Sequence, residues 1–258
     1  MKTFTAEFRE LHQHDDDITR VEETLAKLQG WLVTSIDGRA LSPVSKLPAK
    51  LFDLLQVGLR RTIELAEAAV REMNGGNVVV SYVLVRATFE TACLMLDASR
   101  LAKKTVAKND IALLNDVDKF LMDVLVGFKS KGWGFSEEYI ARNVLTIIQR
   151  LSKELDIELM WYYEGLCEYA HPNYFGMLGT YQTPPPPGEF VVQFGSPSEE
   201  RLQISMKMVI GALAMGLEMM ALALTNQDEV MPAFVDLCER DIHQGGTWPK
   251  GLEYPIKR

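Results

Sequence analysis

The longest stretch of this chain without a turn signal runs from Asn77 to Lys104, and it constrains the fold more than any other feature. Its first residues, Val78 to Val80, favour a strand by propensity. The stretch is far too long for a strand, however, and it continues with Ala, Leu and Met, which favour a helix. Apolar residues occupy nearly every side of that helix. The sequence therefore predicts a long, buried helix at the centre of the protein.

Helical periodicity recurs along most of the rest of the chain. Apolar residues three and four positions apart predict further helices over residues 4–34 (one or two helices), 51–73, 108–128, 137–155, 157–170, 196–224 and 230–243. We expect an all-α fold, a bundle of about seven to nine helices, with at most one short β-hairpin near Phe190. Nothing divides residues 1–258, so a single domain is expected, with helices 4–34 as an appendage to the core bundle.

Two signals mark how the helix of residues 196–224 begins. The four prolines between Thr183 and Gly188 cannot be helical and predict an extended segment. After it, Ser196 is expected to cap the helix, with Pro197 at its first position and Glu199 closing a capping box. Ala212 and Gly216 lie one turn apart in this helix and would allow another helix to approach closely.

Charge and cysteine content limit the function classes. The net charge of −8 argues against broad affinity for a nucleic-acid backbone, although a local basic site remains open. The three cysteines form no CxxC pair, and their odd number favours a reducing, cytoplasmic location. The N-terminus lacks the apolar core of a signal peptide. Lys207 and Glu218 interrupt the apolar segment 206–224, so we expect a buried helix there and no membrane span.

No metal or cofactor is expected. His12 and His14 stand beside three aspartates, but residues two apart point to different sides of a helix. A solvated junction between two helices is the better interpretation. The chain has no GxGxxG, P-loop, HExxH or GxSxG motif and no zinc-ligand spacing.

Arg86 and Glu90 are the first candidate site. They lie one turn apart on the otherwise apolar central helix, and Cys93 and Asp97 continue the same stripe. Charges that are partly buried need partners and hydrogen bonds. The pair is either an ion pair that fixes helix packing or part of a ligand site.

His171 is the second candidate. Pro172 ends the preceding helix, so the imidazole should lie at a helix C-terminus. Polar neighbours that could bind a ligand with it are Glu168, Tyr169 and Asn173. The nearby Trp161, Tyr162 and Tyr163 are interpreted as core or interface aromatics. We expect Arg86, Glu90 and His171 to meet in one polar site between their two helices.

These two motifs carry a family resemblance. The segments Val85-Arg86-Ala87-Thr88-Phe89-Glu90 and 166–173, Leu-Cys-Glu-Tyr-Ala-His-Pro-Asn, resemble those of an uncharacterised bacterial all-helical family allied to the HEPN domains (higher eukaryotes and prokaryotes nucleotide-binding). The resemblance spans about residues 51–224. It implies a single HEPN-like helical domain, frequently a homodimer, and for many members a metal-independent RNase of toxin–antitoxin or phage-defence systems.

The chain departs from the HEPN pattern in one respect. HEPN nucleases place an arginine a few residues before the histidine, whereas residues 161–170 contain none. His171 matches by position only, and Arg86 would have to replace the missing arginine from another helix. We therefore expect a binding or interaction module for a nucleotide, an RNA end or a partner protein. The alternative is an endoribonuclease with His171 and Arg86 as catalytic residues. A homo-oligomer is also expected.

Overall fold

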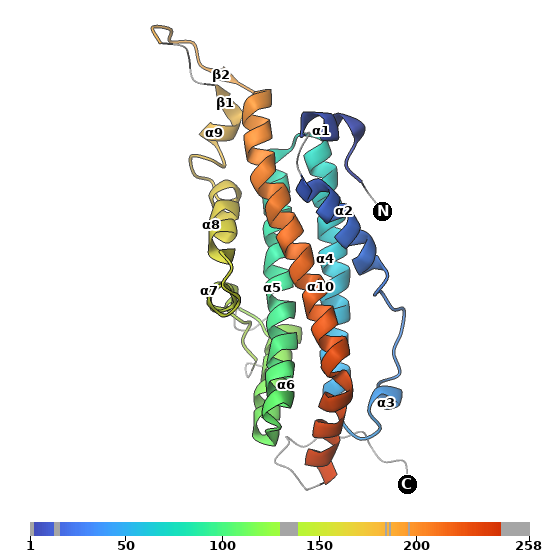
Figure 1. Cartoon of the computed structure of the whole chain (residues 1–258). Coiled ribbons are helices and arrows are strands. Elements are labelled where there is room, and N and C mark those ends of the chain that lie inside the picture. The colour runs from blue at the N-terminus through green and yellow to red at the C-terminus, as the bar shows by residue number, and fades with distance from the viewer. Residues whose placement is uncertain are drawn as a thin grey trace. The chain divides into compact units, whose positions relative to one another are not determined.

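The computed structural model describes residues 3–12, 16–129, 139–183, 185, 187–195 and 197–243. Helices make up 76% of this part of the chain, and a two-stranded antiparallel hairpin is its one sheet, so the all-α prediction is confirmed (Figure 1). Its elements in order are α1 (Ala6–Leu11), α2 (Asp16–Gln29), α3 (Gly38–Leu41), α4 (Leu47–Asn74), α5 (Val78–Lys108), η1 (Ile111–Leu113), α6 (Leu114–Leu125), α7 (Val144–Leu155), α8 (Leu159–Ala170), α9 (Leu178–Tyr181), β1 (Gln182–Thr183), β2 (Gln193–Phe194) and α10 (Glu199–His243).

The long helices α4 and α5 are separated by a turn at Gly75 and Gly76. Gly76 has a φ of 70°, which glycine adopts without a steric penalty. The N–H of Asn77 donates to the carbonyl of Glu72, and the N–H of Gly76 donates to that of Met73. These two bonds form a Schellman motif, which satisfies the last carbonyls of α4 and starts α5 at once.

The C-terminal part of the chain differs from the prediction. Instead of two helices ending and restarting between Leu224 and Val230, α10 continues for 45 residues. Residues 225–229 contain no Gly or Pro to stop it, and buried Met231 and Phe234 keep its later turns packed. Pro232 lies inside the helix on an exposed side, where it removes one backbone hydrogen bond without ending the helix.

Several other boundaries are corrected. Between the predicted helices 4–34 and 51–73 lies the short helix α3, which Asp37 caps. Within the described residues α7 begins only at Val144, because the side chain of Asn143 accepts from the N–H of Leu145. Ser196 lies outside the described residues, and Ser198 caps α10 by accepting from the N–H of Arg201.

The histidine junction near the N-terminus is also revised. His12 is buried against the ring of Phe8, with 4.4 Å between ring centroids, so it is not solvated. His14 lies outside the described residues.

The chain forms two compact units, and each contains a part of α4, α5 and α10. The first comprises residues 1–30, 61–92 and 148–218. Its buried side chains include Tyr82 and Phe89 of α5, Leu166 of α8 and Leu213 of α10. A Cβ added at Gly216 would lie 3.5 Å from Cα of Phe89, so the glycine lets α10 pass close to the α5 backbone, as expected.

The second unit comprises residues 31–60, 93–147 and 219–258. Close helix packing recurs there, because a Cβ added at Gly58 would lie 2.2 Å from Sδ of Met95. Lys50 of α4 donates to Asp118 of α6 at 2.7 Å. Cys93 and Asp97, which continue the stripe of Arg86 and Glu90 in the sequence, are buried in this unit.

Two helices of the described chain, α5 and α10, are long and apolar enough to cross a membrane by length and composition alone. Buried core helices meet the same criteria, and 72% of the most apolar window of α10 is buried inside the fold. Most of the apolar surface of α10 is therefore used within the chain. Homo-oligomerisation stays a prediction and needs a different surface.

Candidate functional site

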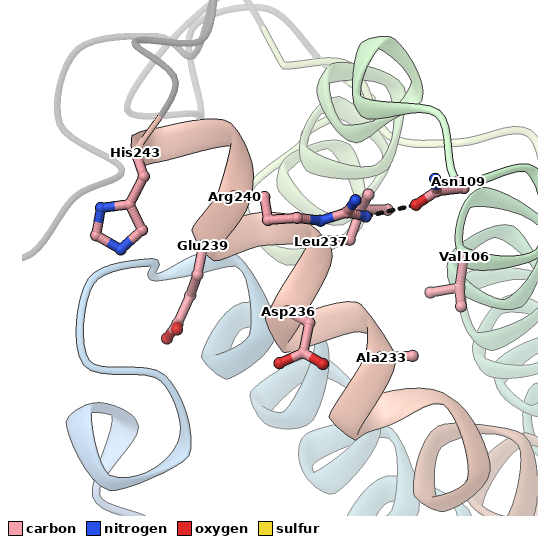
Figure 2. Close-up of a pocket in the computed structure, with 8 residues that line it drawn as sticks. All are labelled: Val106, Asn109, Ala233, Asp236, Leu237, Glu239, Arg240 and His243. Carbon is pink, nitrogen blue, oxygen red and sulfur yellow. Dashed lines mark hydrogen bonds between the residues drawn. The ribbon is translucent and has the colours of Figure 1, made fainter.

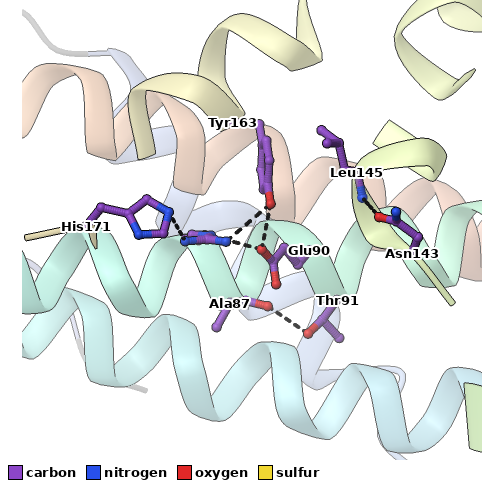
Figure 3. A network of polar contacts seen from close by, with 8 residues as sticks. Ala87, Glu90, Thr91, Asn143, Leu145, Tyr163 and His171 are labelled. Atoms are coloured by element: carbon purple, nitrogen blue, oxygen red, sulfur yellow. Dashed lines mark hydrogen bonds and ion pairs between the residues drawn. The ribbon is translucent and has the colours of Figure 1, made fainter. Parts of the chain in front are cut away.

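The candidate site lies in the first unit, where the end of α8 meets the middle of α5. The residue before a proline disfavours helical backbone, and His171 precedes Pro172. His171 accordingly ends α8 with extended backbone (φ −90°, ψ 150°), while its N–H still donates to the carbonyl of Cys167. This exit leaves the His171 imidazole exposed and directed at α5 (Figure 3).

Three side chains converge there around the guanidinium of Arg86. Its Nε donates to Oε1 of Glu90 at 2.9 Å, and its Nη2 donates to the hydroxyl of Tyr163 at 3.3 Å. That hydroxyl donates in turn to Oε1 of Glu90 at 3.2 Å. Nη1 of Arg86 lies 3.4 Å from Nε2 of His171. Figure 3 shows this network, and the predicted meeting of Arg86, Glu90 and His171 is confirmed.

The contact between Arg86 and His171 indicates which imidazole nitrogen accepts a hydrogen bond. A guanidinium has only donors, so His171 Nε2 must be the nitrogen without hydrogen if it is to accept from Arg86. An imidazole that accepts in this way carries its ring proton on the second nitrogen, Nδ1.

The charges and burial of the cluster shift neighbouring groups. Burial lowers the pKa of Arg86, but the hydrogen bonds with Glu90 and Tyr163 raise it, and the result is a raised pKa. Burial, followed by the charge of Glu90, raises the pKa of Tyr163. Burial also raises the pKa of the adjacent Cys167 thiol, against the effect of Arg86. All three groups therefore keep their protons near neutral pH.

The other predicted ligand residues are not part of this network. Nδ2 of Asn173 donates to Glu168 at 2.8 Å, so these two side chains pair with each other. Tyr169 stacks on Tyr82 with 4.0 Å between ring centroids, and its hydroxyl contacts Ser205 at 3.1 Å. Tyr169 thus packs α8 against α5 and α10, because consecutive residues of α8 point to different sides of the helix.

Tyr163 belongs to the cluster, although it was expected to be a core or interface aromatic. Its position could have indicated otherwise. Residues 163, 167 and 171 are each four apart, so they follow one line along α8. That line is the one that faces Arg86, as the contacts of Tyr163 and His171 show.

The glycine after the site has a structural role. A Cβ added at Gly176 would lie 2.1 Å from the carbonyl oxygen of His171 and 2.7 Å from that of Tyr169. Only a residue without a side chain fits there, so Gly176 lets the chain fold back on the end of α8.

A pocket of about 640 Å³ lies in the second unit, between the end of α5 and the last turns of α10 (Figure 2). Arg240 reaches across it and donates to Asn109, while Asp236, Glu239 and His243 add mixed charge. No feature of this lining points to a particular ligand. Among the described residues no group of three or more His, Cys, Asp or Glu side chains is placed to hold a metal ion.

Comparisons with known proteins found no match: no protein-family model, no curated protein and no solved structure is similar to this chain. The HEPN resemblance therefore stays a prediction that rests on the two short motifs around Arg86 and His171.

Proposed function

We propose that the chain is a binding module, and that the cluster of Arg86, Glu90, Tyr163 and His171 is its ligand site. The candidate ligands are a nucleotide, an RNA end or a partner protein. A nucleotide fits the chemistry of the cluster best, because the cluster combines a cation with a histidine and a carboxylate.

The observation that carries this proposal is the unused hydrogen-bonding capacity of a partly exposed ion pair. Arginine has five N–H donors, and three of those of Arg86 have partners in the described residues, which leaves two. Oε1 of Glu90 accepts both of its hydrogen bonds, which leaves Oε2 available. The side chains of Arg86 and Glu90 are 26% and 29% exposed, so a ligand can reach them.

A nucleotide would use these groups as follows. Its phosphate accepts from the two remaining N–H groups of Arg86, in the paired geometry that guanidinium offers to phosphate. The phosphate charge allows His171 to take up a proton at Nε2 and donate to the same anion. Oε2 of Glu90 accepts from a ribose hydroxyl. Glu90 opposes the phosphate charge, so we expect modest affinity and a preference for a ligand with a hydroxyl beside its phosphate.

The second candidate function is a metal-independent endoribonuclease. The 3.4 Å contact between Arg86 and His171 favours it, since an arginine and a histidine can then act on one phosphate. Glu90 argues against it, because its carboxylate neutralises the arginine that would have to stabilise the pentavalent phosphorane. The net charge of −8 also weakens RNA capture.

One experiment separates the two candidates. Purified wild type, His171→Ala and Arg61→Gln are incubated with mixed RNA in EDTA, and the same proteins are melted with and without adenosine 5′-monophosphate. Arg61 is the matched control, because it also projects from this unit and bonds only Thr91 among the described residues. Binding predicts intact RNA and a nucleotide-dependent rise in melting temperature for wild type and Arg61→Gln only. Cleavage to cyclic phosphate ends that requires His171 would establish the nuclease instead.

A further inference from the structure

An exposed apolar surface lies in the first unit beyond the candidate site. It is formed by the turn before α9, by α9 itself and by the arm that leads into β2. Its main members are Tyr174, Met177, Leu178, Tyr181, Phe190 and Phe194. Phe190 is 94% exposed and Phe194 is 78% exposed, which is unusual for side chains of this size. We call these six residues the apolar arm.

The members of the apolar arm belong to one continuous piece of structure. The N–H of Gly195, next to Phe194, donates to the carbonyl of Tyr181. Gly179 packs against the ring of Tyr174, since a Cβ there would lie 3.3 Å from it. Arg201 of α10 donates to the carbonyls of Gly179 and Gln182 and holds the base of the hairpin. The surface is therefore anchored to α10.

We propose that this apolar arm is an interface with a second copy of the same chain. Its size supports that occupant. With about 200 Å² for a fully exposed aromatic side chain, the six residues expose on the order of 800 Å². The largest apolar patch of a typical monomer is about 300–600 Å², whereas a stable dimer buries about 800 Å² on each partner.

Charge supports a second copy as well. The sequence from Tyr174 to Phe194 contains a single charged residue, Glu189, in a chain whose net charge is −8. Two such acidic chains repel each other on average, and a nearly uncharged region is where this repulsion opposes association least. A surface with a single charge also needs no oppositely charged surface on its partner, so the same patch on two chains can meet across a two-fold axis.

A lipid surface is the competing occupant, and it is disfavoured. Interfacial segments that insert aromatic residues normally carry Lys or Arg beside them to attract anionic headgroups. Along the chain the nearest charges are acidic, Glu189 within the arm and Glu199 and Glu200 after it, and the guanidinium of Arg201 is already bonded to the carbonyls of Gly179 and Gln182. A short two-stranded hairpin is also marginally stable when isolated, and packing against a second hairpin would stabilise it.

The test measures mass by sedimentation equilibrium on the full chain at up to about 100 μM, a range that detects micromolar dissociation constants. We compare wild type with Phe190→Asp/Phe194→Asp and with the control Val57→Asp/Val80→Asp, which places the same charges at valines that are 53% and 45% exposed on α4 and α5. Phe190→Ser is a second, milder variant, and far-UV circular dichroism checks that every protein is folded.

The proposal predicts that wild type and the control are dimers. The Phe190→Asp/Phe194→Asp variant should be a folded monomer, with a dissociation constant raised by about 100-fold or more. A monomeric wild type would overturn the proposal, and so would a double variant that dimerises as tightly as wild type. A monomeric wild type that floats with phosphatidylcholine vesicles would identify a membrane surface instead. The result is independent of nucleotide binding at Arg86.

Discussion

His171 Nε2 lies 3.4 Å from Arg86 Nη1, so the histidine that ends α8 accepts a hydrogen bond from an arginine on α5. The same guanidinium is bonded to Glu90 one turn further along α5. The imidazole therefore lies beside a cation that is already paired with a carboxylate. We propose that this arrangement binds an anion. It is less suited to acid–base catalysis on a phosphate, because the carboxylate of Glu90 already neutralises Arg86.

The pair of Arg86 and Glu90 should stabilise the fold modestly. We expect Arg86→Gln to lower the free energy of unfolding by about 1 kcal/mol, since the pair is partly exposed and solvent screens it. The double variant Arg86→Gln/Glu90→Gln should lose less than the sum of the two single variants, because neither charge is left alone. Urea denaturation measures this, with Arg61→Gln as a control expected within about 0.5 kcal/mol of wild type. Additive losses would mean that the pair contributes nothing.

Cys167 reports on the charge of Arg86 from the other side of the cluster. Burial raises the pKa of its thiol and Arg86 opposes that rise, so Arg86→Gln should raise the pKa further. The rate of alkylation by iodoacetamide follows the thiolate fraction. Its pH midpoint should lie above that of a free cysteine in wild type and move higher in Arg86→Gln.

Two controls make that measurement specific. Cys93 and Cys238 are buried, so native protein should be modified at Cys167 alone, and Cys167→Ser should remain unmodified. An alkylation midpoint that moves down in Arg86→Gln would contradict the arrangement.

Gly176 offers a test that leaves every side chain of the cluster in place. Gly176→Ala puts a methyl group against the carbonyls of His171 and Tyr169, so the backbone that presents the imidazole must shift. We expect nucleotide affinity to fall about tenfold or more, as small displacements of positioned groups commonly cause. Gly216→Ala is the matched control, because its methyl meets α5 at an ordinary 3.5 Å. Equal affinity in both variants would exclude the proposed role of His171.

Pro232 tests the continuity of α10. Pro232→Ala restores the N–H that can donate to the carbonyl of Asp228, and it removes an exposed ring from a helix interior. We expect the free energy of unfolding to rise by about 1 kcal/mol, less than the cost of about 3 kcal/mol for proline in an ideal helix, because loss of proline also loosens the unfolded chain. A destabilised variant would show that the proline ring is needed for packing.

Periodicity was sufficient to predict the fold class and the helix that carries Arg86, because apolar spacing reports directly on burial. It did not predict that α10 continues through residues 225–229, because these polar residues carry no apolar spacing of their own, whereas the buried Met231 and Phe234 keep the later turns packed. The convergence of Arg86, Glu90 and His171 was predictable, because charges on an apolar helix require partners. The prediction that Tyr163 is a core or interface aromatic followed from its residue type. Its position on the line of residues 163, 167 and 171 indicates the cluster instead.

The exposed apolar arm could not have been identified from sequence either. Phe190, Val192 and Phe194 alternate with Val191 and Gln193, so every second residue is apolar, as in a half-buried strand. Only the structure distinguishes side chains that face a core from those that face solvent.

We propose that the Arg86 cluster binds a phosphate-bearing ligand and that His171 changes from a hydrogen-bond acceptor to a donor when the ligand binds. The most direct measurement is the ring-nitrogen NMR spectrum of the four histidines in ¹⁵N-labelled protein during titration with adenosine 5′-monophosphate. His171, assigned through His171→Ala, should gain a proton at Nε2 as the nucleotide binds with a dissociation constant below about 1 mM. Adenosine without phosphate should leave the spectrum unchanged. His171 signals that stay in the neutral form at saturating nucleotide, or that respond equally to adenosine, would contradict the account.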